Sequence, residues 1–94
     1  MNEKKKPKIA VALTYNQDKD RAPVVTASGQ GIIADRIIGL AREHGVPVEE
    51  NPSLAQALSK INPGQEIPAE LYEAVAILLS YVLEMDANVR NKKI

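Results

Sequence analysis

The sequence contains no cysteine, no phenylalanine and no tryptophan among its 94 residues. Without cysteine the chain can form no disulfide, no thiolate metal site and no thiol nucleophile, which fits a reducing compartment. Three tyrosines are the only aromatic residues, so we expect no stacking platform for single-stranded nucleic acid. The core must therefore be built from valine, isoleucine, leucine and alanine.

Charge of one sign and long apolar runs are also lacking. Twelve basic and twelve acidic residues cancel to a formal net charge of zero, which removes the broad attraction that nucleic acids and membrane surfaces exert on basic proteins. No stretch approaches the roughly 20 apolar residues of a membrane span, and no apolar segment of an export signal follows the amino-terminal lysines. We expect a cytoplasmic monomer with no nucleic-acid partner and no insertion into a membrane.

The chain length suits one domain, which we place at residues 9–86 between basic, disordered tails at 1–8 and 87–94. Two apolar segments, 9–15 and 23–27, are typical of strands, and the charged stretch between them favours an antiparallel, hairpin-like pair. Residues 46–49 are predicted as a short third strand. The sequence therefore predicts an α/β fold, a small sandwich with a three- or four-stranded mixed sheet and three helices packed around it.

The first predicted helix runs from Gly31 to Gly45, where a left-handed glycine cap ends it. Because a strand precedes it and a strand follows, we expect a right-handed parallel crossover. Its inward face is expected to carry four apolar residues at helical spacing: Ile33, Ile37, Leu40 and Ala41.

The next two helices have clear start signals. Asn51 can accept a free amide proton of the second helix, and Pro52 sits at the first helical position, where no donor is lost. Pro68 is predicted to open the third helix in the same way, with Glu70 and Glu73 near its positive end.

The third helix, from Pro68 to about Met85, is apolar most of the way round. An inward stripe is predicted for Leu71, Ala74, Val75, Leu78, Val82 and Met85. A second apolar side comprises Ala76, Ile77, Leu79, Tyr81 and Leu83. Either the second helix, with Leu54, Leu58 and Ile61, covers that side, or part of it is left for a partner protein.

One motif invites a nucleotide-binding interpretation. Residues 29–34 match the dinucleotide fingerprint G-x-G-x-x-G/A, and Glu49 and Glu50 follow about 20 residues on. The motif works at a central strand of a parallel sheet with a second half-fold over the cofactor, and this chain is too short for that second half. Glycines that permit a tight strand-to-helix turn are the simpler interpretation, and the nucleotide-binding half-domain is kept as an alternative.

No constellation of catalytic or metal-binding residues is visible. His44 is the sole histidine, it has no thiolate beside it, and its place at a helix end suits the negative end of the macrodipole. Ser28 lacks the preceding glycine of a nucleophile elbow. We therefore predict a protein that is not an enzyme and that binds no metal or other cofactor.

The order of these segments resembles the cytoplasmic domain of the FlhB/YscU family, the export-gate specificity-switch proteins of flagellar and injectisome type III secretion. The resemblance runs from about Ile9 to Met85. The segments that carry it are 10–15 (AVALTY), 22–25 (APVV), 41–48 (AREHGVPV), 52–58 (PSLAQAL) and 64–76 (GQEIPAELYEAVA).

The chain departs from that family at its cleavage site. Family members carry an Asn-Pro-Thr-His turn before the first of these strands and cleave themselves between Asn and Pro. Here the matching stretch, residues 5–8, reads Lys-Lys-Pro-Lys, so the resemblance implies no self-cleavage. It also implies a free-standing paralogue of the cleaved fragment.

The resemblance implies a binding role in type III protein export, with export substrates and export-gate proteins as partners and a location at the membrane-embedded gate. In the family, an apolar patch made by an Ala-Pro corner and the last helix is implicated in substrate docking, and it carries onto Ala22, Pro23, Ala76 and Leu79. The same residues are also expected if they merely pack strand against helix. An alternative role is a regulator that competes with the full-length switch protein.

Family members also contribute a strand upstream of the cleavage turn. The eight residues available here, 1–8, are too short and too charged to replace it. We therefore expect an unpaired sheet edge beside the first strand, open to strand addition from another chain.

Overall fold

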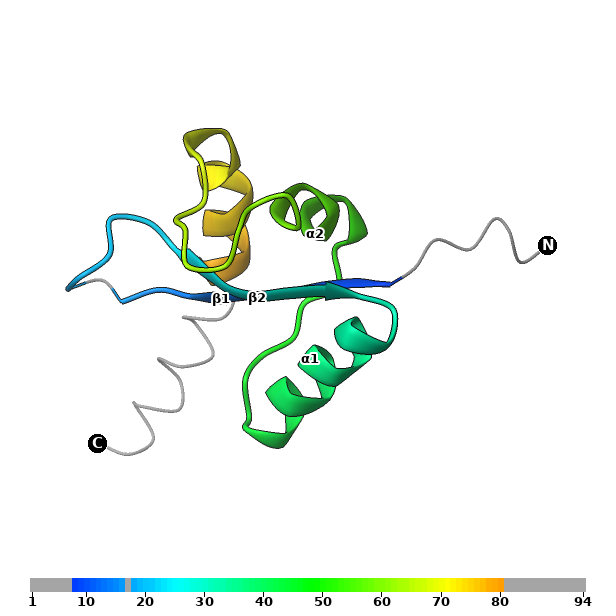
Figure 1. Cartoon of the computed structure of the whole chain (residues 1–94). Helices are drawn as coiled ribbons and strands as arrows, with labels where there is room; N and C mark the ends of the chain where they lie inside the picture. Colours follow the sequence, from blue (N-terminus) through cyan, green and yellow to red (C-terminus); the bar gives the residue numbers. More distant parts are fainter. Residues whose placement is uncertain (1–7, 17, 81–94) are drawn as a thin grey trace, which may run out of the picture.

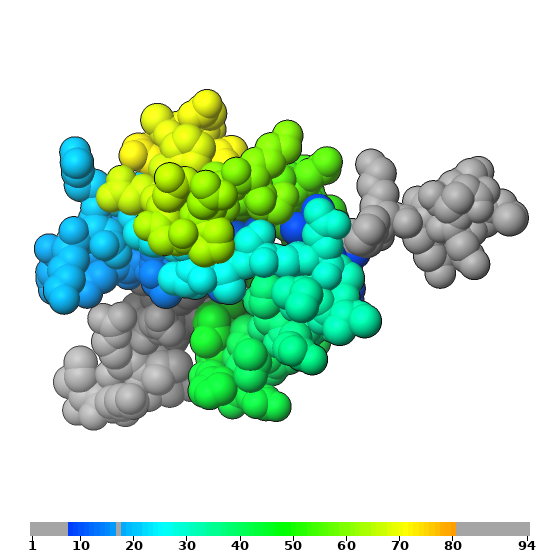
Figure 2. All heavy atoms as spheres, in the orientation of Figure 1, coloured from blue at the N-terminus to red at the C-terminus, as the bar shows by residue number. Residues whose placement is uncertain are grey.

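The computed structural model describes residues 8–16 and 18–80. Two strands, β1 (Ile9–Thr14) and β2 (Val24–Gln30), lie at the centre (Figure 1). Helix α1 (Ile32–Glu43) lies on one side of them, and α2 (Pro52–Leu58) lies on the other together with the last helix. That last helix begins as a 3-10 turn, η2 (Ala69–Leu71), and continues as α-helix over residues 72–80. Figure 2 shows the strands between these two layers. The predicted α/β class with helices on both faces is confirmed.

β1 and β2 form the predicted antiparallel pair. The register runs from Ile9 opposite Gln30 to Thr14 opposite Val24, and it shifts by one residue between Ala12 and Leu13. A shift of this kind is a β-bulge, which adds local twist to the pair.

A third extended segment pairs with β2 on its outer side. Glu66 forms an isolated antiparallel bridge with Val24. Next to it, the Ile67 N–H donates to the Pro23 carbonyl at 2.9 Å. These bonds fix the segment before the last helix against the start of β2.

The predicted third strand at 46–49 is corrected by the structure, because these residues are coil. The segment carries the chain from the α1 side of the sheet to the α2 side, past β1 (Figure 1). Pro47 also has no N–H to give to a ladder. The described residues therefore form a two-stranded sheet instead of three or four strands, and the expected parallel crossover is not found in them.

Helix α1 approaches the sheet closely at a glycine. A Cβ built on Gly29 would lie 2.2 Å from Cγ2 of Ile33, so only glycine fits at this point of β2. At the other end, Gly45 has φ of 71° and follows the helix, as predicted. The predicted inward stripe is partly wrong, because Ile33 and Leu40 are 50% and 52% exposed.

The residue of α1 that is fully buried is Ala34, with Ile37 and Ile38 half-buried beside it. A small side chain at the contact lets the helix axis lie near the sheet. Helix α1 is therefore rotated so that Ala34, and not Ile33 or Leu40, faces the sheet.

Helix α2 begins as predicted. The Leu54 N–H donates to the Asn51 side chain at 3.1 Å, and Pro52 is the first helical residue. Pro68 differs slightly from the prediction, because it precedes η2 in an extended conformation instead of forming its first position.

The main hydrophobic core lies on the α2 side of the sheet. Its buried members are Ala22, Val25, Leu54, Leu58, Ile67 and Val75. Leu78 of the predicted inward stripe packs against this cluster, and so does Leu79 from the predicted second side. Ala74, predicted to face inward, is exposed. The predictions for Tyr81, Val82, Leu83 and Met85 lie outside the described residues.

Candidate docking surface

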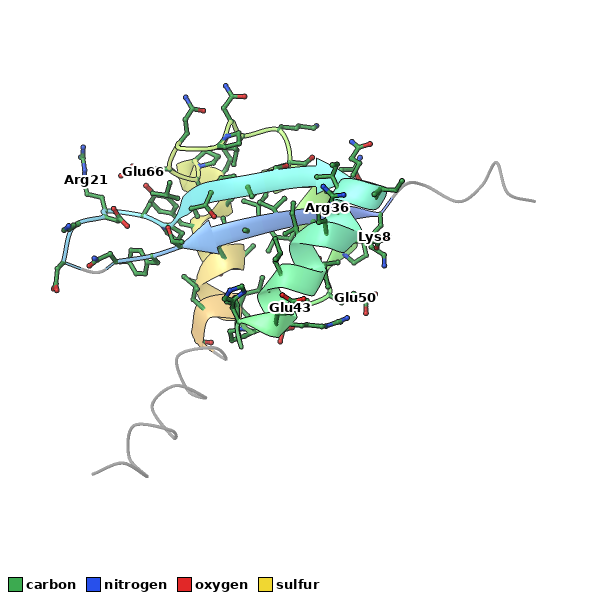
Figure 3. All side chains as sticks on the ribbon, turned by 60° about the horizontal axis from the view of Figure 1, so that its bottom comes forward. Lys8, Arg21, Arg36, Glu43, Glu50 and Glu66 are labelled. Carbon is green, nitrogen blue, oxygen red and sulfur yellow. The ribbon has the colours of Figure 1, made fainter. Side chains whose placement is uncertain are left out.

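The polar groups that could carry chemistry lie apart. In Figure 3, Glu66 lies far from Glu43 and Glu50. The His44 ring Nδ1 lies 2.9 Å from the Leu40 carbonyl of its own helix. Within the described ranges, no group of three or more metal-ligating side chains comes together.

Ser28 has no catalytic partner in His44. Gly29 faces α1, because the Ile33 side chain of α1 occupies the space where a Cβ on Gly29 would lie. Successive strand residues point to opposite faces, so Ser28 faces the α2 side while His44 follows α1.

The glycine-rich turn is used for packing. The Gly31 N–H, which a phosphate would need, donates to the Lys8 carbonyl at 2.8 Å. Gly29 lies under Ile33, and its strand is paired antiparallel. The geometry that a dinucleotide fingerprint requires is therefore not formed here.

The four residues of the predicted docking patch differ in exposure. Ala22 is 2% exposed and belongs to the core cluster, and Pro23 is also buried. Leu79 is half-buried against the same cluster, while Ala76 is exposed. Two of the four predicted residues are thus buried, and only Ala76 and Leu79 on the last helix keep accessible surface.

The corner and the helix are connected by backbone geometry. The Pro23 carbonyl accepts the Ile67 N–H, and Ile67 stands directly before the turn that starts the last helix. Further apolar side chains of that helix are exposed around Ala76, with Tyr72 at 46% and Ile77 at 54%. The last helix therefore presents apolar surface beyond what the core uses.

The surface also has a groove that the sequence did not predict. It has a volume of about 520 Å³ and lies along β1, lined also by α1, residues 46–52 and the last helix. An unpaired sheet edge beside β1 was expected, but the enclosing walls depend on three segments distant in sequence.

The arrangement is that of a small α/β domain known from solved structures. The cytoplasmic domain of FlhB from Shewanella putrefaciens matches with a TM-score of 0.77 at 37% identity, covering 80% of this chain and 61% of that one. The model of the FlhB HrpN YscU SpaS family matches residues 7–82. The chain belongs to this family, whose members serve flagellar and type III protein export.

Two relatives show how this chain compares in length. The flagellar biosynthetic protein FlhB of Aquifex aeolicus is 46% identical over 76 residues, which are 80% of this chain and 22% of that protein. The protein YlqH of Bacillus subtilis is 41% identical over 93 residues, 99% of this chain and 100% of its own length. The chain thus spans about a fifth of FlhB and all of YlqH. No helix within residues 8–80 has the length and apolarity that crossing a bilayer demands.

Proposed function

We propose that this chain is a non-enzymatic protein-binding module of flagellar-type export, which contributes to the recognition or passage of export substrates at the cytoplasmic face of the export gate. The observation that carries the proposal is the family match over residues 7–82. The related domain from Shewanella putrefaciens is a cytoplasmic domain, which supports a cytoplasmic location for this one.

The docking patch is the proposed point of attachment. Ala76 and Leu79 would contact a partner directly, because they are the two patch residues with accessible surface, while Ala22 and Pro23 are buried. The exposed apolar side chains around Ala76 suit the burial of a few apolar side chains of a partner.

The test is complementation of a strain whose FlhB lacks its cytoplasmic domain. Secretion of flagellar substrates should be restored by this chain and abolished by Ala76→Asp, because a carboxylate at this position must be desolvated when a partner docks. Ala74→Asp is the matched control, since Ala74 is equally exposed on the same helix and lies outside the patch. Equal secretion by both variants would remove the patch from the proposal.

A regulator that competes with the full-length switch protein is supported by the 46% identity to the FlhB segment. Its expected behaviour differs. Overproduction in a strain with intact FlhB would lower secretion, and pull-downs would recover gate proteins without export substrates.

A further inference from the structure

Helix α1 has a second face that the sheet does not use. Ala34 faces the sheet, and the opposite side of the helix carries four exposed residues at spacings of four, three and four: Ile32, Arg36, Gly39 and Glu43. Figure 1 shows α1 as the one described helix on its side of the sheet. We call these four residues, together with Ile33 and Leu40 beside them, the outer face of α1.

Apolar side chains are concentrated on the outer face and next to its end. Ile32 is 76% exposed, and Ile33 and Leu40 are about half exposed. Val46, just after the helix, is exposed to the same extent as Leu40. The solvent face of a surface helix ordinarily carries polar and charged residues instead. A stripe that recurs every three or four residues is typical of a helix that packs lengthwise against another helix.

The two charges of the outer face do not pair with each other. Arg36 and Glu43 lie seven residues apart, which is about 10.5 Å along a helix. Figure 3, in which the α1 side is turned forward, shows them at separate turns of the helix. Within residues 8–16 and 18–80, the ion pair that forms joins Lys8 to Asp35 and involves neither of them. Opposite charges at this spacing are complementary to a second helix that carries the same two charges in the reverse direction.

A second copy of α1 has that charge pattern when it packs antiparallel to the first. Arg36 and Glu43 lie equally far from the midpoint between Gly39 and Leu40, on opposite sides of it. A twofold axis through this midpoint therefore places Arg36 of each copy opposite Glu43 of the other. Because the interface is symmetric, this contact is formed twice.

The apolar residues match under the same symmetry. Leu40 of each copy lies over Gly39 of the other, where nothing lies within 4 Å of an added Cβ. The start of one helix lies beside the end of the other, which brings Ile33 next to Val46 of the second copy. A glycine at the crossing point allows the two helices to approach closely.

We propose that two copies of this chain form an antiparallel dimer through the outer faces of α1. The helix has 12 residues and is about 18 Å long, so one helix from each copy makes a small interface and a weak, reversible dimer. The chain is then a monomer at low concentration, as expected from the sequence, and a dimer when concentrated. The outer face shares no residue with the docking patch, and the inference does not depend on the export role.

The first test is sedimentation equilibrium of the full chain at low salt, from about 10 µM to about 1 mM. The average mass should rise from that of one chain, 10.2 kDa, toward that of two. A chain that stays monomeric throughout this range overturns the proposal. That result is expected if another protein, or residues 81–94 of the same chain, covers the outer face instead.

A charge exchange tests the register of the two helices. Glu43→Arg places like charges at both symmetric contacts and should weaken the dimer about tenfold or more, and Arg36→Glu should do the same. A mixture of the two single variants again places opposite charges at each contact, and so does one chain with both changes. Both should recover the dimer. Failure of both to recover it overturns the antiparallel pairing.

Matched controls separate the outer face from other surfaces. Glu70→Arg changes the net charge as much as Glu43→Arg does, at an exposed position of η2, and should leave the association unchanged. Leu40→Asp should abolish the dimer up to about 1 mM, whereas Ile77→Asp, at a similarly exposed position of the last helix, should not. All of these sites are on the surface, so circular dichroism should show an unchanged fold. Equal weakening within either pair contradicts the interface.

Discussion

The two faces of the sheet are built on different principles. On the α2 side, large side chains such as Leu58, Ile67 and Val75 are almost fully buried. On the α1 side, the buried residues are Ala10 and Ala34. The first layer is held by hydrophobic burial, and the second by close backbone contact between small residues.

The two layers therefore contribute differently to stability and to accessible surface. Burial of large aliphatic side chains contributes about 1.5–3 kcal/mol each, so the α2 layer supplies most of the stability. Helix α1 leaves Ile32, Ile33 and Leu40 half or more exposed, and its inner residues line the groove. The α1 layer therefore contributes less to stability than the α2 layer, but it leaves the groove at the edge of β1 open.

The largest expected effect compares one leucine in each layer. Leu58→Ala should lower the free energy of unfolding by about 2–5 kcal/mol, because Leu58 is 4% exposed and its loss leaves a cavity. Leu40→Ala, at 52% exposure in α1, should change it by less than about 1 kcal/mol. Urea denaturation measures both. Similar losses in the two variants would show that the layers contribute equally.

The next effect tests the close approach of α1. Gly29→Ala puts a Cβ 2.2 Å from Cγ2 of Ile33, and the overpacking should cost about 1–3 kcal/mol. Gly39→Ala, on α1 with nothing within 4 Å of the new Cβ, should instead stabilise by about 0.5–1 kcal/mol through helix propensity. Thermal denaturation of the two glycine variants should therefore shift in opposite directions. A stabilised Gly29→Ala protein would mean that α1 is not held at this distance.

A smaller effect is expected at the start of α2. Asn51→Ala removes the side-chain acceptor of the Leu54 N–H and should cost about 1 kcal/mol. Asn51→Asp keeps an acceptor and should retain most of the stability. If alanine and aspartate behave alike in urea denaturation, the cap does not stabilise the layer.

The smallest effect belongs to the ion pair at the start of α1. The Lys8 and Asp35 side chains are 60% and 65% exposed, so solvent screens their attraction. Asp35→Asn should cost no more than about 0.5 kcal/mol at low salt, and the cost should disappear at high salt. A larger or salt-independent loss would assign Asp35 a structural role in the α1 layer.

Local signals predicted the elements well. The hairpin, the Asn51-Pro52 start of α2 and the Gly45 end of α1 depend on residues adjacent in sequence, and each is confirmed. The third strand at 46–49 is the main error. Alternating apolar residues indicate an extended chain, but they do not say whether a neighbouring strand is available for pairing.

The predicted docking patch illustrates a similar limit. Ala76 and Leu79 belong to the second apolar side that the sequence predicts for the last helix, and they were candidates for docking a partner. In the structure Ala76 is exposed and Leu79 is half-buried. Helical periodicity groups residues on a face, but burial depends on how far the helix is rotated toward its neighbours. Docking at these residues stays a prediction.

By itself, the sequence determined the hairpin, the start of α2 and the end of α1, because capping, turn chemistry and apolar period act over a few residues. Its resemblance to known proteins indicated the family. Only the tertiary structure decided that 64–67 and not 46–49 lies against the hairpin, that α1 turns Ala34 inward, and that a groove borders β1. These outcomes arise from competition among distant segments for the same sheet edges and faces, and that competition is settled by packing in three dimensions.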